Sequence, residues 1–226
     1  MNQNTVTSCC LCSQIHGNAE NDVISRLIAE HTYRRRIPME SSHFAVVPDI
    51  GPLAPGHSLI CPKVHVRSFA QLHHELNAEY HELKAIVSNH LRSSFGAPVH
   101  CFEHGSAAHD SRIVCSISHA HVHMLPGHVE VLEVLLSSDA RWEAIPLDLD
   151  DLQKRTAGDE YLFYEDPSGH AFIARASGCP FDSQYMRRLF AQRLNKDHDW
   201  NWRENLLPHE ADRTFRTLMG QCEPLA

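Results

Sequence analysis

The chain has 226 residues, of which 42% are apolar and 21% charged, a composition that is ordinary for a globular protein with one large core. No apolar run approaches the roughly 20 residues that a membrane span needs, and the N-terminus lacks the basic start and apolar stretch of a secretory signal. We therefore expect a cytoplasmic protein without a membrane partner. The net charge of −8, with histidine neutral, argues against a nucleic-acid partner, because nucleic-acid-binding proteins usually present a broad basic face.

The predicted elements of the first half describe an α+β protein. The Cys-rich start, SCCLC, is expected to form a turn followed by a loop or a short helix. A long helix is predicted from Phe69 to Leu91, where apolar residues recur at helical spacing, after a capping box of Ser68 and Gln71. Short strands are predicted at 44–47, 58–61, 99–105 and 113–126. Their order around the helix favours an antiparallel sheet, and a turn rich in Gly and Pro joins the first two strands.

The second half carries weaker signals. Residues 160–176 are typical of a β-hairpin that turns at 167–169, and residues 182–195 of a helix with Asp182 or Ser183 as its N-cap. The predicted parts of the chain are a domain at 1–130 and a C-terminal α/β extension at 131–226 that packs on it.

The segment CSISHAHVHMLP places a histidine at every second position, at His119, His121 and His123. In a β-strand these three side chains fall on one face, with apolar residues on the other. Packing alone explains such a row poorly, because each ring brings polar nitrogens that need partners. From the residues themselves two functions stay open. One is metal binding, for which imidazole is a common ligand, and the other is attack on phosphorus by an imidazole nitrogen.

Three motifs in chain order resemble those of one protein family. HAHVHMLP matches the His-φ-His-φ-His-φ-φ pattern, with φ apolar, of the histidine triad (HIT) superfamily. DIGPLAPGHSLICPKVHVRSF looks like the Pro-Gly-His strand of that family followed by Pro-Lys-x-His, and SCCLCSQIHGNAEND is similar to the Cys-x-x-Cys opening of its zinc-containing bacterial members. The motifs cover about residues 9–126, and CFEHGS looks like a bacterial subgroup with Phe-Glu-His-Gly before the triad. The resemblance implies a HIT-like antiparallel sheet with a long helix.

The resemblance also implies an enzyme, a nucleotidyl hydrolase that cleaves a dinucleoside polyphosphate or a nucleoside phosphoramidate at the α-phosphate. In the family the middle histidine attacks phosphorus, which assigns His121 as the nucleophile of a covalent nucleotidyl-histidine. Its second ring nitrogen is expected to donate to a backbone carbonyl. His123 is expected to contact the phosphate oxygens, and Ser116 to contact the leaving group or the phosphate.

The eight cysteines, three of them crowded in CCLC, favour thiol or metal chemistry. The resemblance implies one zinc ligand set, formed by Cys9, Cys12, His65 and His119. Two thiolates and two imidazoles close a tetrahedral site, so the Zn²⁺ is expected to be structural. The alternative is that the cysteines are free thiols and that His119 only hydrogen-bonds the backbone.

The resemblance also assigns residues to the nucleotide. Phe44 and Val46 are the candidates for contact with the base, and Asp49 for contact with the ribose hydroxyls. As alternatives, Phe44 and Val46 suit the core equally well, and Asp49 suits the cap of a turn. Glu103, from the Phe-Glu-His-Gly motif, stands near a position where most other members have Asn or Gln, and it is assigned to the nucleotide as well.

The predicted C-terminal helix adds two further candidates, Gln184 and Arg188, which lie four apart on one helical face. Arginine suits bidentate contact with phosphate, so this helix is assigned to nucleotide binding on the side of the leaving group. The alternative is a solvated charged face whose apolar side packs inward.

Other functions stay open beside the hydrolase. The same intermediate serves a nucleotidyltransferase or phosphorylase if an acceptor other than water takes the nucleotide. A noncatalytic nucleotide-binding sensor would bind without turnover, and a metal transporter would bind metal at His121 and His123. The resemblance also allows a homodimer.

Overall fold

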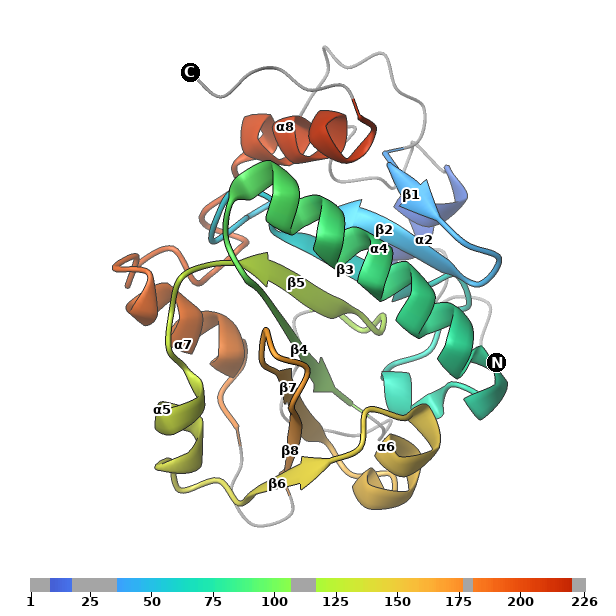
Figure 1. Cartoon of the computed structure of the whole chain (residues 1–226), viewed down its shortest axis with the longest axis vertical. Helices are drawn as coiled ribbons and strands as arrows, with labels where there is room; N and C mark the ends of the chain where they lie inside the picture. The colour runs from blue at the N-terminus through green and yellow to red at the C-terminus, as the bar shows by residue number, and fades with distance from the viewer. Residues whose placement is uncertain (1–8, 18–35, 107–116, 177–180, 221–226) are drawn as a thin grey trace.

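The strands of the computed structural model lie in one sheet, with helices on both of its faces (Figure 1). The structure describes residues 9–17, 36–106, 117–176 and 181–220. The strands are β1 (Met39–Glu40), β2 (Phe44–Pro48), β3 (Ser58–Pro62), β4 (Val99–Gly105), β5 (Val122–Pro126), β6 (Trp142–Ile145), β7 (Tyr161–Glu165) and β8 (Ala171–Arg175). The helices are α2 (Cys10–His16), α4 (Asn77–Phe95), α5 (Leu132–Leu136), α6 (Leu149–Thr156), α7 (Tyr185–Arg193) and α8 (Pro208–Leu218), with 3₁₀ turns η1 (Phe69–Gln71) and η2 (His74–Leu76).

The sheet has the order β1-β2-β3-β5-β4-β7-β8-β6, and each neighbouring pair of strands is antiparallel. The predicted α+β class with an antiparallel sheet is therefore confirmed. Strands β7, β8 and β6 continue the sheet beyond β4, so strands from before and after residue 130 share one sheet. The position of the domain boundary stays a prediction. Within the described ranges, no helix combines the length and apolar character needed to cross a membrane.

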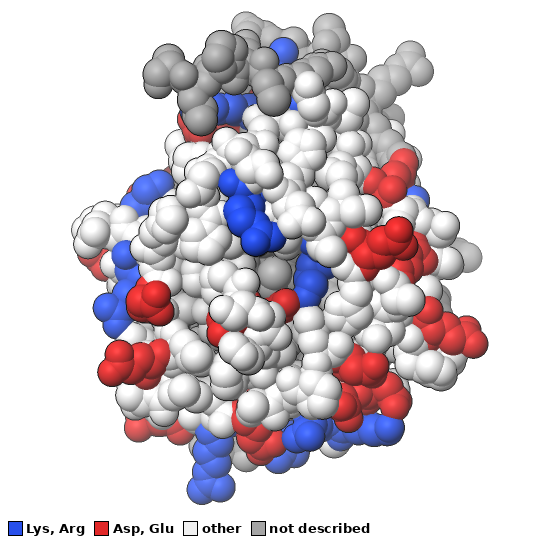
Figure 2. All heavy atoms as spheres, in the orientation of Figure 1, with Lys and Arg blue, Asp and Glu red and all other residues white. Residues whose placement is uncertain are grey.

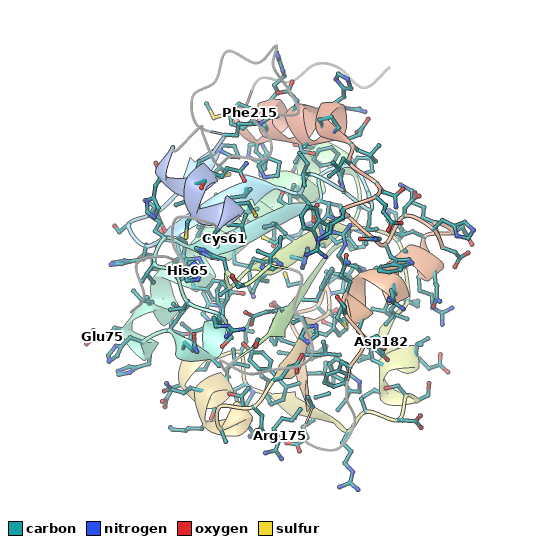
Figure 3. All side chains as sticks on the ribbon, turned by 180° about the vertical axis from the view of Figure 1, so that it is seen from behind. Cys61, His65, Glu75, Arg175, Asp182 and Phe215 are labelled. Atoms are coloured by element: carbon teal, nitrogen blue, oxygen red, sulfur yellow. The ribbon has the colours of Figure 1, made fainter. Side chains whose placement is uncertain are left out.

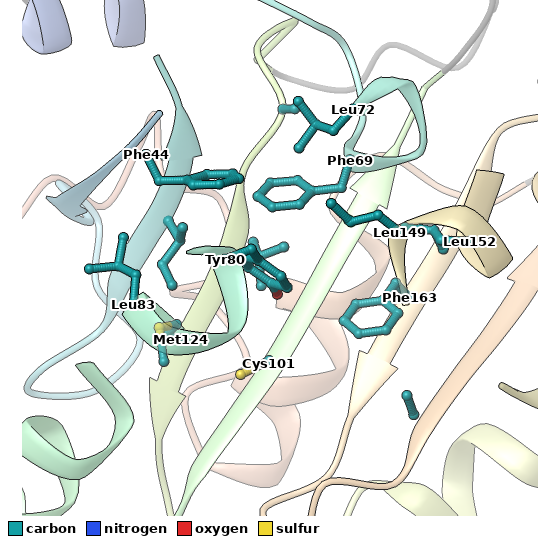
Figure 4. Close-up of a cluster of buried hydrophobic side chains, with 14 of the residues drawn as sticks. Phe44, Phe69, Leu72, Tyr80, Leu83, Cys101, Met124, Leu149, Leu152 and Phe163 are labelled. Atoms are coloured by element: carbon teal, nitrogen blue, oxygen red, sulfur yellow. The ribbon is translucent and has the colours of Figure 1, made fainter. Parts of the chain in front are cut away.

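The face of the sheet that α4 covers holds the larger core. Figure 4 shows its centre, where Phe44, Phe69 and Tyr80 lie together; the ring centroids of Phe44 and Phe69 are 6.0 Å apart. Val46, Ile60 and other inward residues of the strands belong to the same cluster and are fully buried. Burial of such side chains stabilises the fold by roughly 1.5–3 kcal/mol each.

The long helix begins later than the sequence predicts, at Asn77. The capping box is wrong, because the Ser68 side chain makes no cap hydrogen bond and Gln71 Oε1 accepts from the Arg67 N–H at 2.8 Å. Instead, Glu103 Oε1 accepts from the Phe69 N–H at 2.9 Å. A carboxylate from a distant strand thus holds a 3₁₀ turn where local residues predict the start of the helix.

The opposite face carries a row of side chains across five strands. Register pairs Val47 with Leu59, Leu59 with His123, His123 with Phe102, and Phe102 with Tyr164. Residues directly opposite each other in antiparallel strands share a face. His123 therefore lies in the middle of an otherwise largely apolar row, on the side of the sheet away from α4.

The turn between β2 and β3 requires its glycine. Gly56 has a φ of +84°, and a Cβ added there would lie 2.5 Å from the Phe95 ring. Only glycine fits both the left-handed backbone and the close ring. Its N–H donates to Thr214 Oγ1 at 3.2 Å, so α8 also holds the turn that presents His57.

The strand predicted at 113–126 is shorter, because β5 begins at Val122. Residues 113–116 lie outside the described ranges. The Ala120 N–H donates to the Val66 carbonyl at 2.8 Å, so this residue bonds a loop in place of a strand of the sheet.

The predicted hairpin is confirmed as β7 and β8, with Gly169 at φ +89° in its turn. The predicted C-terminal helix is confirmed as α7, but its N-cap is wrong. Gln184, with φ +59°, occupies that position in place of Asp182 or Ser183.

Charged residues on the face seen in Figure 1 are mixed in sign. Lys and Arg side chains are interspersed with Asp and Glu side chains over several elements, and grey atoms cover part of the view (Figure 2). The absence of a nucleic-acid partner stays a prediction.

Candidate active site

His121 and His123 lie side by side at the start of β5, on the face of the sheet away from α4. Their ring centroids are 4.9 Å apart, with the ring planes 69° from parallel. His123 is buried and stacks on Phe102 with a centroid distance of 4.4 Å, whereas His121 is half-buried. Figure 3 views this face, with α2 at the left of the view and α7 at the right.

A backbone carbonyl fixes the tautomer of His121. His121 Nδ1 lies 2.7 Å from the carbonyl oxygen of His119, and a carbonyl only accepts, so Nδ1 carries the proton. The expected bond from the second ring nitrogen is confirmed. Loss of hydration lowers the pKa of His121, which keeps the ring neutral near pH 7 and leaves a lone pair on Nε2.

A chain of hydrogen bonds orients His123 in the same way. The Leu53 N–H donates to His57 Nδ1 at 3.2 Å, so the proton of His57 is on Nε2. His57 Nε2 then donates to His123 Nδ1 at 2.9 Å, which places the proton of His123 on Nε2. Burial lowers the pKa of both rings well below the ordinary value. His123 is therefore a neutral hydrogen-bond donor beside the lone pair of His121.

A buried ion pair closes the site from the C-terminal part of the chain. Arg187 Nη1 donates to Asp49 Oδ2 at 2.8 Å, Nη2 to the Gly51 carbonyl at 2.6 Å, and Nε to the Trp200 carbonyl at 2.9 Å. Asp49 Oδ1 also accepts from the Gly51 N–H at 2.8 Å. Asp49 therefore caps the turn, as the alternative from the sequence proposes, and it lines the cavity at His121 as well.

The side chains of Asp49, His57 and His123 lie close enough together to suggest a second metal site, with ligand atoms within 4.8 Å of one another. His57 Nε2 and His123 Nδ1 each lie 3.6 Å from Asp49 Oδ2. These two nitrogens are already joined by the hydrogen bond between the rings. The guanidinium of Arg187 puts a fixed positive charge 2.8 Å from the same oxygen. This arrangement disfavours a cation there.

Two cavities meet at the histidine pair. The first, which we call the α2 cavity, has about 600 Å³ of empty space when its opening to solvent is counted, and is lined by Leu11, Gln14, Val47, Leu59 and Trp202 among others. The second, the α7 cavity, has about 360 Å³ counted in the same way and includes Phe102, His104, Gln184 and Tyr185 in its wall. His121, His123 and Arg187 line both. A molecule with two parts joined at one atom could place that atom at the histidine pair.

The four predicted metal ligands come together beside this pair. Their ligand atoms, in Cys9, Cys12, His65 and His119, all lie within 4.8 Å of one another. Cys12 Sγ is 3.2 Å from Nδ1 of each of the two histidines, and Cys9 Sγ is 3.6 Å from His119 Nδ1. His119 Nε2 lies 2.8 Å from the Pro62 carbonyl, which holds the proton there and leaves Nδ1 free for a cation. Figure 3 labels His65, which lies near α2.

The two thiols of the cluster differ in acidity. A hydrogen bond from Cys12 lowers the pKa of Cys9, and the nearby His119 adds to this effect. The neighbouring Cys9 sulfur raises the pKa of Cys12, as does burial. One thiolate is therefore available without a metal, and a bound divalent cation would favour the second.

Two of the residues assigned to the base do not reach either cavity. Phe44 and Val46 point into the core beneath α4, which is the alternative that the sequence left open. Side chains alternate along a strand, so their neighbour Val47 lies on the site face and lines the α2 cavity in their place.

Glu103 also lies on the face of α4. It is buried, accepts from the Phe69 N–H at 2.9 Å, and receives the Tyr161 hydroxyl at 2.5 Å. Burial raises its pKa to about 7. The structure therefore gives Glu103 a role in holding η1 and does not bring it to His121.

The helix α7 reaches the site through a different arginine from the one assigned. Gln184 lines the α7 cavity, but Arg188 lines neither cavity, and its guanidinium carbon lies 3.9 Å from the centre of the Trp200 ring. Arg187 lines both cavities instead. Ser116 lies outside the described ranges.

Sequence reasoning also missed several residues that line the α2 cavity, namely Leu11, Gln14, Val47, Leu59 and Trp202. The register of β2 could have identified Val47 once His123 was placed on the site face. The backbone of Trp202 lies close to Gly51, where an added Cβ would be 2.9 Å away. The two residues are about 150 positions apart in the sequence, so no local pattern could have identified Trp202.

Comparison with known proteins identifies one domain. Residues 33–130 match the family model described as HIT domain. The predicted resemblance is confirmed at that level, and the Phe-Glu-His-Gly subgroup stays a prediction. No curated protein matches the chain.

Several solved structures are similar. A hypothetical histidine triad nucleotide-binding protein from Sulfolobus tokodaii is 24% identical, over 46% of this chain and 66% of that chain, with a TM-score of 0.34. This chain therefore spans slightly less than two thirds of that relative. A Zn-bound histidine triad family protein from Mycobacterium smegmatis is 22% identical, over 54% of this chain and 76% of that chain, with a TM-score of 0.39. A HIT family member from Bacillus subtilis is 19% identical, over 66% of this chain and 92% of that chain, with a TM-score of 0.39.

The ion pair between Arg187 and Asp49 makes a testable prediction about stability. Arg187→Met leaves a buried carboxylate without its partner, so we expect the free energy of unfolding to fall by about 3 kcal/mol. Arg188→Met, on the half-exposed neighbour that pairs with Asp182 at 3.8 Å, should cost about 1 kcal/mol or less. Urea denaturation of both variants checks this. Equal losses in the two variants would refute the assigned role of Arg187.

Proposed function

We propose that the protein is a nucleotidyl hydrolase that cleaves a nucleoside phosphate derivative at its α-phosphate through a covalent nucleotidyl-His121. The observation that carries this proposal is the geometry of His121. Its Nδ1–H is held by the His119 carbonyl at 2.7 Å, and its Nε2 lone pair stands where two cavities meet. The HIT domain match at 33–130 supports the same reaction class.

In the first step, the lone pair of His121 Nε2 attacks phosphorus. The bond from phosphorus to the leaving group breaks, and that group departs with the bonding electron pair and takes a proton from solvent. The ring then carries a positive charge, which the His119 carbonyl stabilises through the Nδ1–H bond. His123 Nε2–H is oriented to donate to a phosphate oxygen as negative charge develops there.

In the second step, water attacks the same phosphorus and loses a proton, and the P–N bond returns its electrons to Nε2. The products are a nucleoside monophosphate and the released group. A cationic imidazole is a good leaving group, so the intermediate is open to water. If another acceptor occupies the place of water, the same chemistry makes a nucleotidyltransferase.

The two cavities suggest how a substrate lies. The α2 cavity has apolar walls from Val47, Leu59 and Trp202, which suit the faces of a nucleobase, and Asp49 stands at its edge for the ribose hydroxyls. A carboxylate oxygen that accepts one bond keeps a lone pair for another. The α7 cavity, with Gln184 in its wall, is then the place for the leaving group. A dinucleoside polyphosphate or a nucleoside phosphoramidate has this two-part form.

We also propose that Cys9, Cys12, His65 and His119 bind a structural Zn²⁺. The donor set fits, because two sulfurs and two Nδ1 atoms converge within 4.8 Å and no substrate position is left among four ligands. When bound, the metal cross-links α2 to the segment that carries His121. It takes no part in the steps above.

The first test traps the intermediate. Wild-type protein mixed with an adenosine phosphoramidate of lysine, quenched in alkaline denaturant and weighed intact, should gain the mass of one nucleotidyl group. His121→Ala should lose the adduct and reduce turnover by roughly a thousandfold or more, because the nucleophile is gone. His128→Ala, at an exposed histidine, should leave both unchanged.

The outcomes separate the alternatives. Full turnover in the His121→Ala variant would overturn the proposal. Tight binding of the substrate by wild type without adduct or turnover would identify a noncatalytic sensor. An adduct that opens only when a phosphate or nucleotide acceptor is added would identify a transferase.

The second test measures metal. Elemental analysis of the purified protein should find about one zinc per chain, and Cys12→Ser should lose most of it because three ligands hold Zn²⁺ less tightly than four. Cys10→Ser is the matched control, since its sulfur is not in the cluster, and should keep the metal. A chelator should lower the thermal midpoint of wild type. Zinc retained by the Cys12 variant and lost by the Cys10 variant would show that the ligand set is wrong.

A further inference from the structure

Gln14 carries an unusual polar group. Its side chain is 4% exposed, and its Nε2 atom is fully buried without a hydrogen-bond partner among the residues that the structure describes. Such a group costs free energy in the folded state, and most buried polar groups are paired for that reason. An unpaired buried amide therefore calls for an explanation.

The position of Gln14 provides one. Gln14 lines the α2 cavity, as do Leu11 of the same helix and Val47 and Leu59 of strands β2 and β3. Arg67, Ser68 and Arg188 also have a buried polar atom without a partner in the described chain, and none of them lines this cavity. The residue that carries the unpaired donor thus forms part of the wall of a cavity that also reaches His121.

The backbone holds Gln14 in place. It lies in α2, whose first turn is fixed by the Ser13 N–H donating to the Cys9 carbonyl at 3.0 Å and by the Cys12 N–H donating to Cys9 Sγ at 3.5 Å. The helix ends at Gly17, with φ +72° and an N–H that donates to the Gln14 carbonyl at 3.4 Å. The backbone that carries Gln14 is therefore fixed by hydrogen bonds at both ends of a short helix.

We infer that Gln14 is a specificity-determining residue, whose Nε2 donates to an acceptor atom on the edge of a heteroaromatic base bound in the α2 cavity. This rests on the proposed function, since it takes the ligand of that cavity to be a nucleotide. The apolar walls bind the faces of a ring but do not distinguish one ring from another. An amide reads a base edge through its donor and its acceptor, and a site built to pair with a polar edge discriminates strongly against a ligand that lacks it.

The test compares ligands with and without the base. Wild type and Gln14→Met, of equal length but apolar, are titrated by calorimetry with the four nucleoside monophosphates and with ribose 5-phosphate, using the metal-containing protein as purified. For the tightest nucleotide, the variant should bind roughly tenfold more weakly. For ribose 5-phosphate the two proteins should be equal. Gln14→Glu, which keeps the shape but loses the donor, should bind the nucleotide at least as weakly as Gln14→Met.

A second measurement guards against a folding defect. Because Gln14→Met removes an unpaired buried donor, the ligand-free variant should unfold at a higher urea concentration than wild type. Equal nucleotide affinity in both proteins, or the same loss for ribose 5-phosphate as for the nucleotide, would overturn the inference while leaving the proposed function standing. If wild type binds a nucleotide but forms no His121 adduct, the proposed function would be overturned, and the inference about Gln14 would still stand. No binding of any nucleotide by wild type would end both.

Discussion

The structure depends on His119, whose ring belongs to the cluster of Cys and His side chains and whose backbone carbonyl holds the ring of the proposed nucleophile. Its Nδ1 faces the sulfurs of Cys9 and Cys12, its Nε2 lies 2.8 Å from the Pro62 carbonyl, and its own carbonyl lies 2.7 Å from Nδ1 of His121. The orientation of the His121 ring is thus set by the backbone of a residue two positions away, whose own ring is held at both of its nitrogens. This links the position of α2 to the protonation of His121.

Because side chains alternate along a strand, the sheet has one face that packs on the core and another that carries the candidate site. In β5, Val122 and Met124 pack beneath α4, while His123 faces the other side, where α2 and α7 flank it. The C-terminal part then contributes to the site itself. Arg187 crosses to Asp49 and Gly51, and the Leu207 N–H donates to the Ile50 carbonyl at 2.8 Å. The loop between β2 and β3 is therefore held by residues beyond the HIT domain match.

Motifs with strict spacing could be predicted from the sequence, and contacts between distant segments could not. The strands at Phe44 and Val99, the hairpin after Tyr161 and the four convergent Cys and His residues follow from local pattern or resemblance. Phe44 could not be assigned to a face from its own strand, since an all-buried strand such as β2 has no polar side to mark the period. The start of α4 was misplaced because Glu103, a tertiary partner, bonds the Phe69 N–H. The sequence could not show that Arg187, and not Arg188, reaches the site, because Arg187 is held there by Asp49, about 140 positions away.

The proposed chemistry requires that His121 presents an unprotonated Nε2 because its proton is held on Nδ1. Nitrogen-15 NMR of histidine-labelled protein, with His121→Ala to assign the signal, reads the tautomer directly. We expect a neutral His121 ring near pH 7, with a protonated Nδ1 and an unprotonated Nε2. A ring that is cationic at this pH, or that carries its proton on Nε2, would contradict it.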